Sequence, residues 1–394
     1  MKKLLLASAI AAVAGSAAYA EEVKLGVLIG FTGPLESAAP DMKAGAELAA
    51  KQISDSGLFL DGSTVTIVTG DTGCIDAQLA VASAERMITS DGVKGIVGGQ
   101  CSGETGAALQ NVAIPNGMVM ISPSATSPGL STVEDNGLFF RTSPSDARQG
   151  QVMADVIWER GIKTAAVTYT NNDYGKGLAD SFAAAFAEKG GKVTMNAAHE
   201  DGKADYSAEV GALASAGGDI LVVAGYVDQG GGGMVKASLD SGAFDLFYFP
   251  DGMVGDALAT NYAALTEGSF GDIPGNESEG SARYIEMATA AGFSPTNAFS
   301  PESYDAAALI LLAMQAAGST DPAVYKEKIL EVANAPGEQI LPGDLPKALE
   351  ILKAGGDIDY VGASAVELNE VGDPAGSYRI IEMKDGQMVT AGYR

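Results

Sequence analysis

The chain has 394 residues, in which 24 lysines and arginines stand against 50 aspartates and glutamates, so the net charge is −26. This length corresponds to two or more domains and is enough to bury a substantial core. A charge this negative repels phosphate backbones and anionic lipid surfaces. We therefore expect no nucleic-acid partner and no function at a membrane surface.

The N-terminal segment has the three-part layout of a secretory signal peptide. Lys2 and Lys3 precede an apolar run over residues 4–13, and Ala-Tyr-Ala at 18–20 precedes a cleavable bond. The apolar run is shorter than the roughly 20 residues that span a bilayer, and no cysteine follows it for lipid attachment. We predict a signal peptide over residues 1–20 and a soluble protein of the bacterial periplasm; a retained N-terminal anchor is the alternative.

Cysteine usage agrees with an exported chain. Cys74 and Cys101 are the only cysteines, and an even pair in an oxidising compartment predicts a disulfide. The bond would close a loop of 27 residues and stabilise the fold by about 3 kcal/mol. The single histidine, His199, is far away in sequence, so we expect it on the surface and predict no metal site.

From residue 21 to about 266, short β-branched runs alternate with segments that carry apolar residues at helical spacing. The predicted strands cover residues 23–29, 64–69, 95–97, 118–122, 164–170, 192–195 and 219–224. The predicted helices between them cover residues 42–53, 77–89, 149–159 and 176–189. Continuous apolar strands alternating with helices are typical of parallel sheets covered on both faces. The sequence therefore predicts an α/β fold.

Three breaks interrupt the alternation, near residues 139–144, 268–280 and 355–372. We interpret them as three crossings between two Rossmann-like lobes with parallel sheets, which together form a three-crossover hinge. The predicted lobe 1 comprises residues 21–141 and 271–360, and the predicted lobe 2 comprises residues 142–270 and 361–394. Helices over 278–291 and 304–317 would then return to lobe 1.

The usual catalytic signatures are absent from the sequence. It contains no Gly-x-Ser-x-Gly elbow, no Walker loop, no Gly-x-Gly-x-x-Gly after the first strand and no His-Glu-x-x-His. His199 has no plausible serine or cysteine partner, and a hydrolase that uses carboxylates alone is unsupported. We predict a protein that is not an enzyme and that needs no cofactor.

Two neighbouring predicted strands end in loops of small polar residues. Residues 98–104 combine glycines with Ser102 before a predicted helix, and residues 122–128 are rich in hydroxyls. The carboxyl ends of parallel strands lie together, and a helix start favours an anion such as a carboxylate. The pair of loops predicts a shared carboxylate pocket, although hydroxyls before helices also serve simply as caps.

Five segments occur in the same order in the branched-chain amino-acid binding proteins of ABC transporters. They are Gly98-Gly99-Gln100-Cys101-Ser102, Met120 to Pro128, Phe140-Arg141-Thr142, Asp173-Tyr174-Gly175-Lys176-Gly177 and Phe249-Pro250-Asp251-Gly252. The chain resembles this family over nearly all of its length after residue 20, including the cysteine pair. The resemblance implies the type I periplasmic binding protein fold with its three crossovers.

The resemblance also implies a ligand site. Ser102, Ser124, Ala125 and Thr126 would hold the α-carboxylate of the ligand. Asp251 would receive its ammonium group, and Tyr174 and Tyr226 would close over it from lobe 2. A zwitterion needs donors at one end and a carboxylate at the other, which these residue types provide. Without the resemblance, Asp251 would be interpreted as a turn residue and the tyrosines as core.

Two departures from the family pattern bear on specificity. Ala38 stands where the family often places an aromatic residue against the ligand side chain, and residues 230–233 are four glycines in place of bulkier residues. Both changes predict added space or added backbone donors, and hence a ligand other than leucine, isoleucine or valine.

We therefore expect a monomer that captures a small amino acid or related carboxylate by closure of two lobes and delivers it to an ABC transporter permease. Two alternatives remain open at this point. The closed form could dock a membrane receptor as a sensor, or the ligand could be a carboxylate or amide that is not an amino acid.

Overall fold

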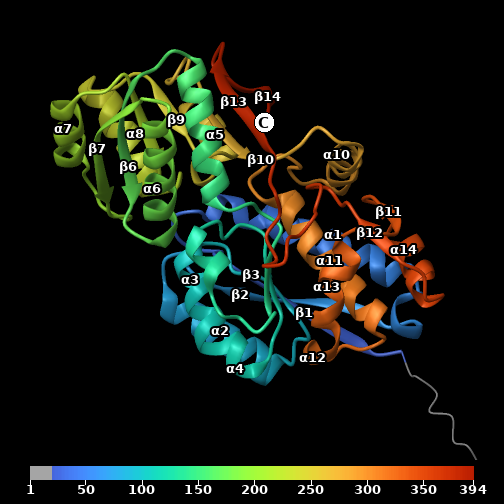
Figure 1. The fold of residues 1–394 in the computed structure, drawn as a ribbon. Helices are drawn as coiled ribbons and strands as arrows, with labels where there is room; N and C mark the ends of the chain where they lie inside the picture. Colours follow the sequence, from blue (N-terminus) through green and yellow to red (C-terminus); the bar gives the residue numbers. More distant parts are fainter. Residues whose placement is uncertain (1–19) are drawn as a thin grey trace, which may run out of the picture.

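Two sheets divide the protein into two lobes, as the computed structural model shows for residues 20–394 (Figure 1). The predicted signal peptide lies, apart from its last residue, outside the described residues. The sheet of lobe 1 is parallel, with the order β2-β1-β3-β4-β5. Its strands are β1 (Glu22–Ile29), β2 (Thr64–Asp71), β3 (Ile96–Gly98), β4 (Met120–Ser122) and β5 (Phe139–Arg141).

Alternate residues of β1 enter two different layers of the core. Leu25, Val27 and Ile29 belong to the large cluster that includes α1 (Ala39–Asp55) and α11 (Ser300–Ala317), whereas Leu28 packs with α2 (Ala77–Arg86). Side chains of a strand point to opposite faces in turn, so helices cover both faces of this sheet.

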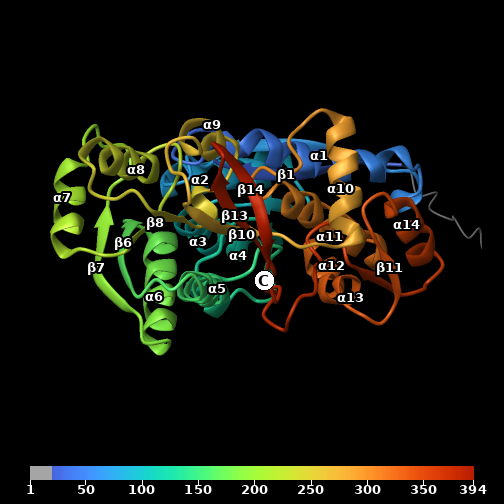
Figure 2. The same ribbon diagram turned by 90° about the horizontal axis from the view of Figure 1, so that it is seen from above.

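The sheet of lobe 2 has seven strands in the order β14-β13-β10-β9-β8-β6-β7. Its parallel strands are β6 (Thr164–Thr170), β7 (Lys192–His199), β8 (Ile220–Ala224), β9 (Phe247–Phe249) and β10 (Phe270–Pro274). The hairpin of β13 (Tyr378–Lys384) and β14 (Gln387–Tyr393) adds an antiparallel edge. Seen from above, the lobes lie side by side with this hairpin over the middle of the molecule (Figure 2).

The remaining elements complete the two lobes. In and around lobe 1 they are α3 (Ser102–Ala108), α4 (Ile114–Asn116), α10 (Glu279–Ala291), α12 (Pro322–Tyr325), α13 (Ile329–Ala333), α14 (Leu345–Lys353), β11 (Glu338–Ile340) and β12 (Ile358–Tyr360). In lobe 2 they are α5 (Asp146–Glu159), α6 (Asp173–Glu188), α7 (Ser207–Ala216), α8 (Gly230–Ser241) and α9 (Asp256–Tyr262). The α/β fold that the sequence predicts is confirmed.

Two predicted lobe boundaries are wrong by several residues. The second crossing follows Pro274 and not residue 270, because β10 pairs with β13 along its whole length. The third comes after residue 361, because the N–H groups of Ala363 and Ser364 donate to Asp305 in α11, and Asp373 pairs with Arg141 at 2.6 Å. The sequence around these crossings consists of short apolar strands and glycine-rich turns, and such local patterns do not predict which distant residues pair with them.

His199 is buried, which contradicts the surface position predicted for it. Its side chain is 1% exposed because β7 runs four residues further than predicted and carries it beneath α8. Its Nδ1 lies 2.8 Å from Thr168 Oγ1, and burial lowers its pKa to about 4. This histidine is therefore a neutral part of the core of lobe 2.

Within residues 20–394, no single helix is long and apolar enough to cross a membrane. Only α11 together with the segment Pro322–Ala333 passes the test of length and composition, and the pair is bent by 91°.

Candidate functional site

A small cavity of about 10 Å³ lies where the two lobes meet. Its walls carry hydroxyl and apolar groups on the lobe 1 side and two tyrosines and a carboxylate on the lobe 2 side. The lining residues are Leu35, Gln100, Cys101, Ser102, Ser124, Tyr174, Tyr226, Asp251, Gly252 and Phe299. Five of the eight predicted ligand-binding residues are among them.

The lobe 1 wall consists of the loops that follow β3 and β4. The Ser127 N–H donates to Ser102 Oγ at 3.0 Å, and Ser124 Oγ donates to the Gln100 carbonyl at 2.8 Å. These bonds lock the two loops together and present both hydroxyl groups at the cavity. Ala125 and Thr126 follow in the second loop and are buried, but they do not line the cavity.

Glu104 fixes the first of these loops through two hydrogen bonds to its backbone. Its Oε1 accepts the N–H groups of Gln100 at 2.8 Å and Cys101 at 3.0 Å. Burial raises the pKa of Glu104 to about 8, although these two hydrogen bonds lower it in part. The side chain thus positions the residues just before Ser102 without reaching the cavity itself.

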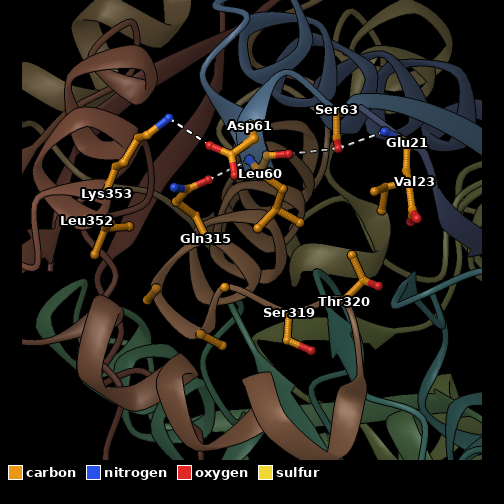
Figure 3. Close-up of a pocket in the computed structure, with 13 residues that line it drawn as sticks. Glu21, Val23, Leu60, Asp61, Ser63, Gln315, Ser319, Thr320, Leu352 and Lys353 are labelled. Carbon is orange, nitrogen blue, oxygen red and sulfur yellow. Dashed lines mark hydrogen bonds and ion pairs between the residues drawn. The ribbon is translucent and has the colours of Figure 1, made fainter. Parts of the chain in front are cut away.

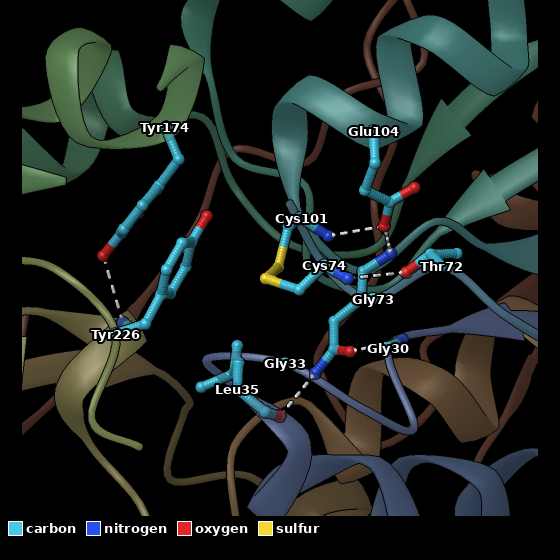
Figure 4. Close-up of a disulfide and its surroundings, with 12 residues drawn as sticks. Gly30, Gly33, Leu35, Thr72, Gly73, Cys74, Cys101, Glu104, Tyr174 and Tyr226 are labelled. Atoms are coloured by element: carbon cyan, nitrogen blue, oxygen red, sulfur yellow. Dashed lines mark hydrogen bonds between the residues drawn. A yellow bond between two sulfur atoms is a disulfide. The ribbon is translucent and has the colours of Figure 1, made fainter. Parts of the chain in front are cut away.

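The structure contains the predicted disulfide between Cys74 and Cys101. It ties the loop after β2 to the start of α3, and Cys101 itself lines the cavity. Figure 4 shows this bond facing Tyr174 and Tyr226 of lobe 2, with Leu35 of lobe 1 nearby. The disulfide is therefore part of the wall of the site as well as a covalent link.

Asp251 supplies the charged group of the lobe 2 wall. It is 1% exposed, accepts a hydrogen bond from Tyr174 Oη at 2.6 Å and accepts the Gly252 N–H at 2.7 Å. Burial raises its pKa to about 6, while hydrogen bonds from Tyr174, Gly252 and Gln149 lower it.

Two further carboxyl groups lie buried behind Asp251. Burial, together with the charge of Asp251, raises the pKa of Asp146 and of Asp272 well above the usual range. Neither residue lines the cavity. Asp251 is therefore the member of this group that carries charge at neutral pH and faces the site.

The two tyrosines of lobe 2 form an aromatic wall. Tyr174 and Tyr226 stack with ring centroids 5.1 Å apart and planes 20° apart, and Asn172 Nδ2 donates to Tyr226 Oη at 3.3 Å. These contacts fix the orientation of both rings.

The structure shows no added space at Ala38 or at the four glycines, where the sequence predicts it. Ala38 is buried outside the cavity, and Leu35, three residues earlier, lies in the wall. The glycines at 230–233 leave no open space, because a Cβ at Gly231 would approach Met253 Sδ to 2.3 Å. Their N–H groups are also occupied, since Gly230 donates to Asp201 and Gly231 to the Tyr226 carbonyl.

Sequence reasoning missed Leu35, Gln100 and Phe299 as wall residues. Gln100 had a local signal, since it stands in the glycine-rich loop before Ser102. Its side chain accepts the Gly30 N–H at 2.7 Å and donates to the Leu35 carbonyl at 3.1 Å, and so positions Leu35. Phe299 comes from just before α11, and only the tertiary fold brings it here.

A wider hollow of about 860 Å³ lies elsewhere on lobe 1, around the end of α11 (Figure 3). It contains the exposed ion pair of Lys353 and Asp61 at 2.9 Å. No residue predicted to bind a ligand lies in it.

Two lobes that enclose a cavity, with hydroxyl groups on one side and a carboxylate on the other, define a two-lobed binding protein. The family model described as periplasmic binding protein matches residues 22–337. The chain belongs to this family. It is 33% identical to the Leu/Ile/Val-binding protein homolog 1 of Brucella melitensis over 332 residues, which cover 82% of this chain and 86% of the relative.

Solved structures share the fold. The leucine binding protein LivK of Thermotoga maritima aligns over 94% of this chain and 98% of its own, with a TM-score of 0.79 and 22% identity. A solute binding protein of an ABC transporter from R. palustris, solved in complex with benzoate, aligns over 94% of this chain and 96% of its own, with a TM-score of 0.76 and 18% identity.

Proposed function

We propose that this periplasmic binding protein captures a small aliphatic amino acid between its lobes and delivers it to an ABC transporter permease. The observation that carries the proposal is Asp251, the one charged side chain among the residues that line the cavity. A buried carboxylate facing a closed site is a partner for an ammonium group. Ser102 offers a hydroxyl donor for the carboxylate at the other end, since its oxygen only accepts the Ser127 N–H, whereas the Ser124 hydroxyl already donates to the Gln100 carbonyl.

The cavity wall favours an amino acid over a plain carboxylate. A ligand such as benzoate would place its anion in a cavity whose lining supplies a carboxylate and no cationic side chain. Leu35 and Phe299 give an apolar wall for an aliphatic side chain. With the reasons for an unusual ligand removed, the name of the Brucella relative supports leucine, isoleucine and valine as the first candidates.

Binding must involve movement of the lobes or of the side chains in the cavity wall. A cavity of about 10 Å³ holds little more than one water molecule, so an amino acid enters only when the lobes separate or the wall side chains move. We propose that the three crossings act as the hinge, that the ligand leaves chemically unchanged, and that the exported chain begins at Glu21 after cleavage of residues 1–20.

Calorimetry with three related ligands tests the proposal. Leucine carries both charges, 4-methylpentanoate lacks the ammonium group and leucinamide lacks the carboxylate. We expect leucine to bind and each analogue to lose at least roughly a hundredfold in affinity, because each leaves a buried polar group of the site unpaired. Binding of 4-methylpentanoate or benzoate as tight as that of leucine would overturn the proposal. Mass spectrometry of the recovered ligand checks that it is unchanged.

A further inference from the structure

A second cavity lies between the lobes on the far side of Phe299, which lines both cavities. Its volume is about 160 Å³. Lobe 1 contributes α10 and the start of α11, and lobe 2 contributes the end of β10 and the hairpin of β13 and β14. It is large enough for a small molecule, and no sequence motif pointed to it.

An acidic and a basic side chain line this cavity. Glu302 at the start of α11 is 2% exposed, yet within residues 20–394 its carboxyl group forms no ion pair and accepts no hydrogen bond from another residue. Arg379 of β13 uses one of its donors, with Nη2 donating to the Thr296 carbonyl at 3.2 Å. Burial, the largest effect, raises the pKa of Glu302 to about 8, whereas its own backbone N–H and the positive charge of Arg379 lower it in part. The carboxyl group is therefore mostly protonated at neutral pH until a cation lies beside it.

Both groups therefore have hydrogen-bonding capacity that no other residue uses, and Glu302 is the buried one of the two. The Glu302 carboxyl group is buried and accepts a hydrogen bond only from its own backbone N–H, and a guanidinium has five donors in a fork that matches a carboxylate. The amide groups of Asn276 and Asn297 also line the cavity. Within residues 20–394, Glu302 and Arg379 form no ion pair with each other, and both line the same cavity of about 160 Å³.

We propose that this cavity is a second ligand site, which binds a small amino acid with its carboxylate on Arg379 and its ammonium group on Glu302. The site is separate from the Asp251 cavity and does not depend on the function proposed there. Because Glu302 belongs to lobe 1 and Arg379 to lobe 2, a ligand held by both bridges the lobes. It then favours this arrangement of the lobes and tightens binding at the Asp251 cavity.

Equilibrium dialysis of radiolabelled L-alanine against the full protein carrying Asp251→Asn tests the second site alone, because this change removes the ammonium partner of the first site. We expect saturable binding of one equivalent. Adding Arg379→Gln or Glu302→Gln should weaken it by roughly tenfold or more. The control Arg394→Gln removes the same charge from the neighbouring strand end, where the side chain is 46% exposed, and should change nothing.

Two outcomes overturn the second site: no saturable alanine binding to the Asp251→Asn protein, or binding that Arg379→Gln and Glu302→Gln leave unchanged. Thermal melting of each variant shows whether it is folded. If Arg379→Gln fails to fold, Arg379→Lys keeps the charge but loses the two-pronged contact, and it should still weaken alanine binding. Leucine binding to the unaltered protein is measured separately, so failure of either site is recognised by itself.

Discussion

At the scale of single residues, the chemistry of the main site depends on which of three buried carboxyl groups is ionised. Asp146, Asp251 and Asp272 are all buried, and burial raises the pKa of each. Only Asp251 combines a pKa of about 6 with a place in the cavity wall and hydrogen bonds from Tyr174 and Gly252. Burial, and second to it the charge of Asp251, raises the pKa values of Asp146 and Asp272 well above the usual range, so this pair stays neutral.

Asp251→Asn should weaken amino-acid binding by roughly a hundredfold or more, since an unpaired buried ammonium group costs about 3 to 5 kcal/mol. The melting temperature without ligand should hold or rise, because the variant has no buried charge at this position. Calorimetry and thermal melting measure the two effects. Binding within threefold of the unaltered protein would show that Asp251 does not meet an ammonium group.

Amino-acid affinity should depend on pH through Asp251. The carboxyl must be ionised to hold an ammonium group, and without ligand its pKa is about 6. Affinity should therefore be constant near pH 8 and fall as the pH drops below about 6, by up to about tenfold per pH unit. Titrations at pH 5, 6, 7 and 8 measure this, with proton release expected at the acidic end. A flat profile down to pH 5 would contradict the assignment.

At the scale of elements, the loop that leads into α3 is fixed by hydrogen bonds to Glu104, a side chain whose protonation depends on pH. Glu104 has a pKa of about 8 in the fold against an ordinary value of 4.5, so its contribution to stability is complete below pH 4.5 and is lost as the pH rises through 8. Its Oε1 is also the acceptor that holds the N–H groups of Gln100 and Cys101.

Glu104→Gln keeps an oxygen acceptor for those N–H groups and removes the titration. The variant should gain in free energy of unfolding relative to the unaltered protein as the pH rises from 5 to 9. Urea denaturation at pH 5, 7 and 9 measures the difference. The control Glu327→Gln, at a side chain that is 75% exposed, should show no such trend. Parallel pH profiles for Glu104→Gln and the unaltered protein would refute the role.

Reduction of the Cys74–Cys101 disulfide should lower the free energy of unfolding by about 3 kcal/mol, the value for a closed loop of this size. The fold should persist, because a core of two lobes does not depend on one link. Amino-acid binding should weaken as well, since Cys101 is part of the cavity wall. Denaturation and calorimetry with and without reductant measure both effects, and a Cys74→Ala, Cys101→Ala double variant reproduces them without reductant.

At the scale of the whole molecule, the lobes also touch outside the cavity. Asp228 of lobe 2 accepts the Ser37 N–H at 2.9 Å, and its own N–H donates to the Pro34 carbonyl at 3.2 Å. These two bonds join the loop after β8 to the loop before α1. They stabilise the closed arrangement without reaching the ligand site.

Asp228→Ala should therefore speed release of the bound amino acid and weaken affinity by roughly threefold to tenfold, the value of one hydrogen bond. Asp228→Asn, which keeps an acceptor oxygen, should stay close to the unaltered protein. Stopped-flow release measurements distinguish the variants. An unchanged release rate in Asp228→Ala would show that these bonds do not contribute to closure.

Local patterns in the amino-acid sequence determine much of this protein by themselves. Runs of β-branched residues between helical segments predict the α/β fold, because parallel strands buried on both faces must be apolar throughout. The family resemblance predicts Ser102, Ser124, Tyr174, Tyr226 and Asp251 as ligand-binding residues, and all five line the cavity between the lobes. The disulfide follows from an even count of cysteines in an exported protein.

Only the tertiary structure decided which neighbours complete the site. Phe299 and Leu35 line the cavity although they come from distant segments, whereas Ala38 does not line it. The space beside the glycines at 230–233 is occupied by neighbouring groups, among them Met253 and Tyr206. His199 and Glu302 have ordinary sequence surroundings, yet packing buries both and moves their pKa values in opposite directions. Burial and long-range pairing depend on segments that are far apart in the sequence and meet only in the folded molecule. Local sequence patterns therefore do not predict them.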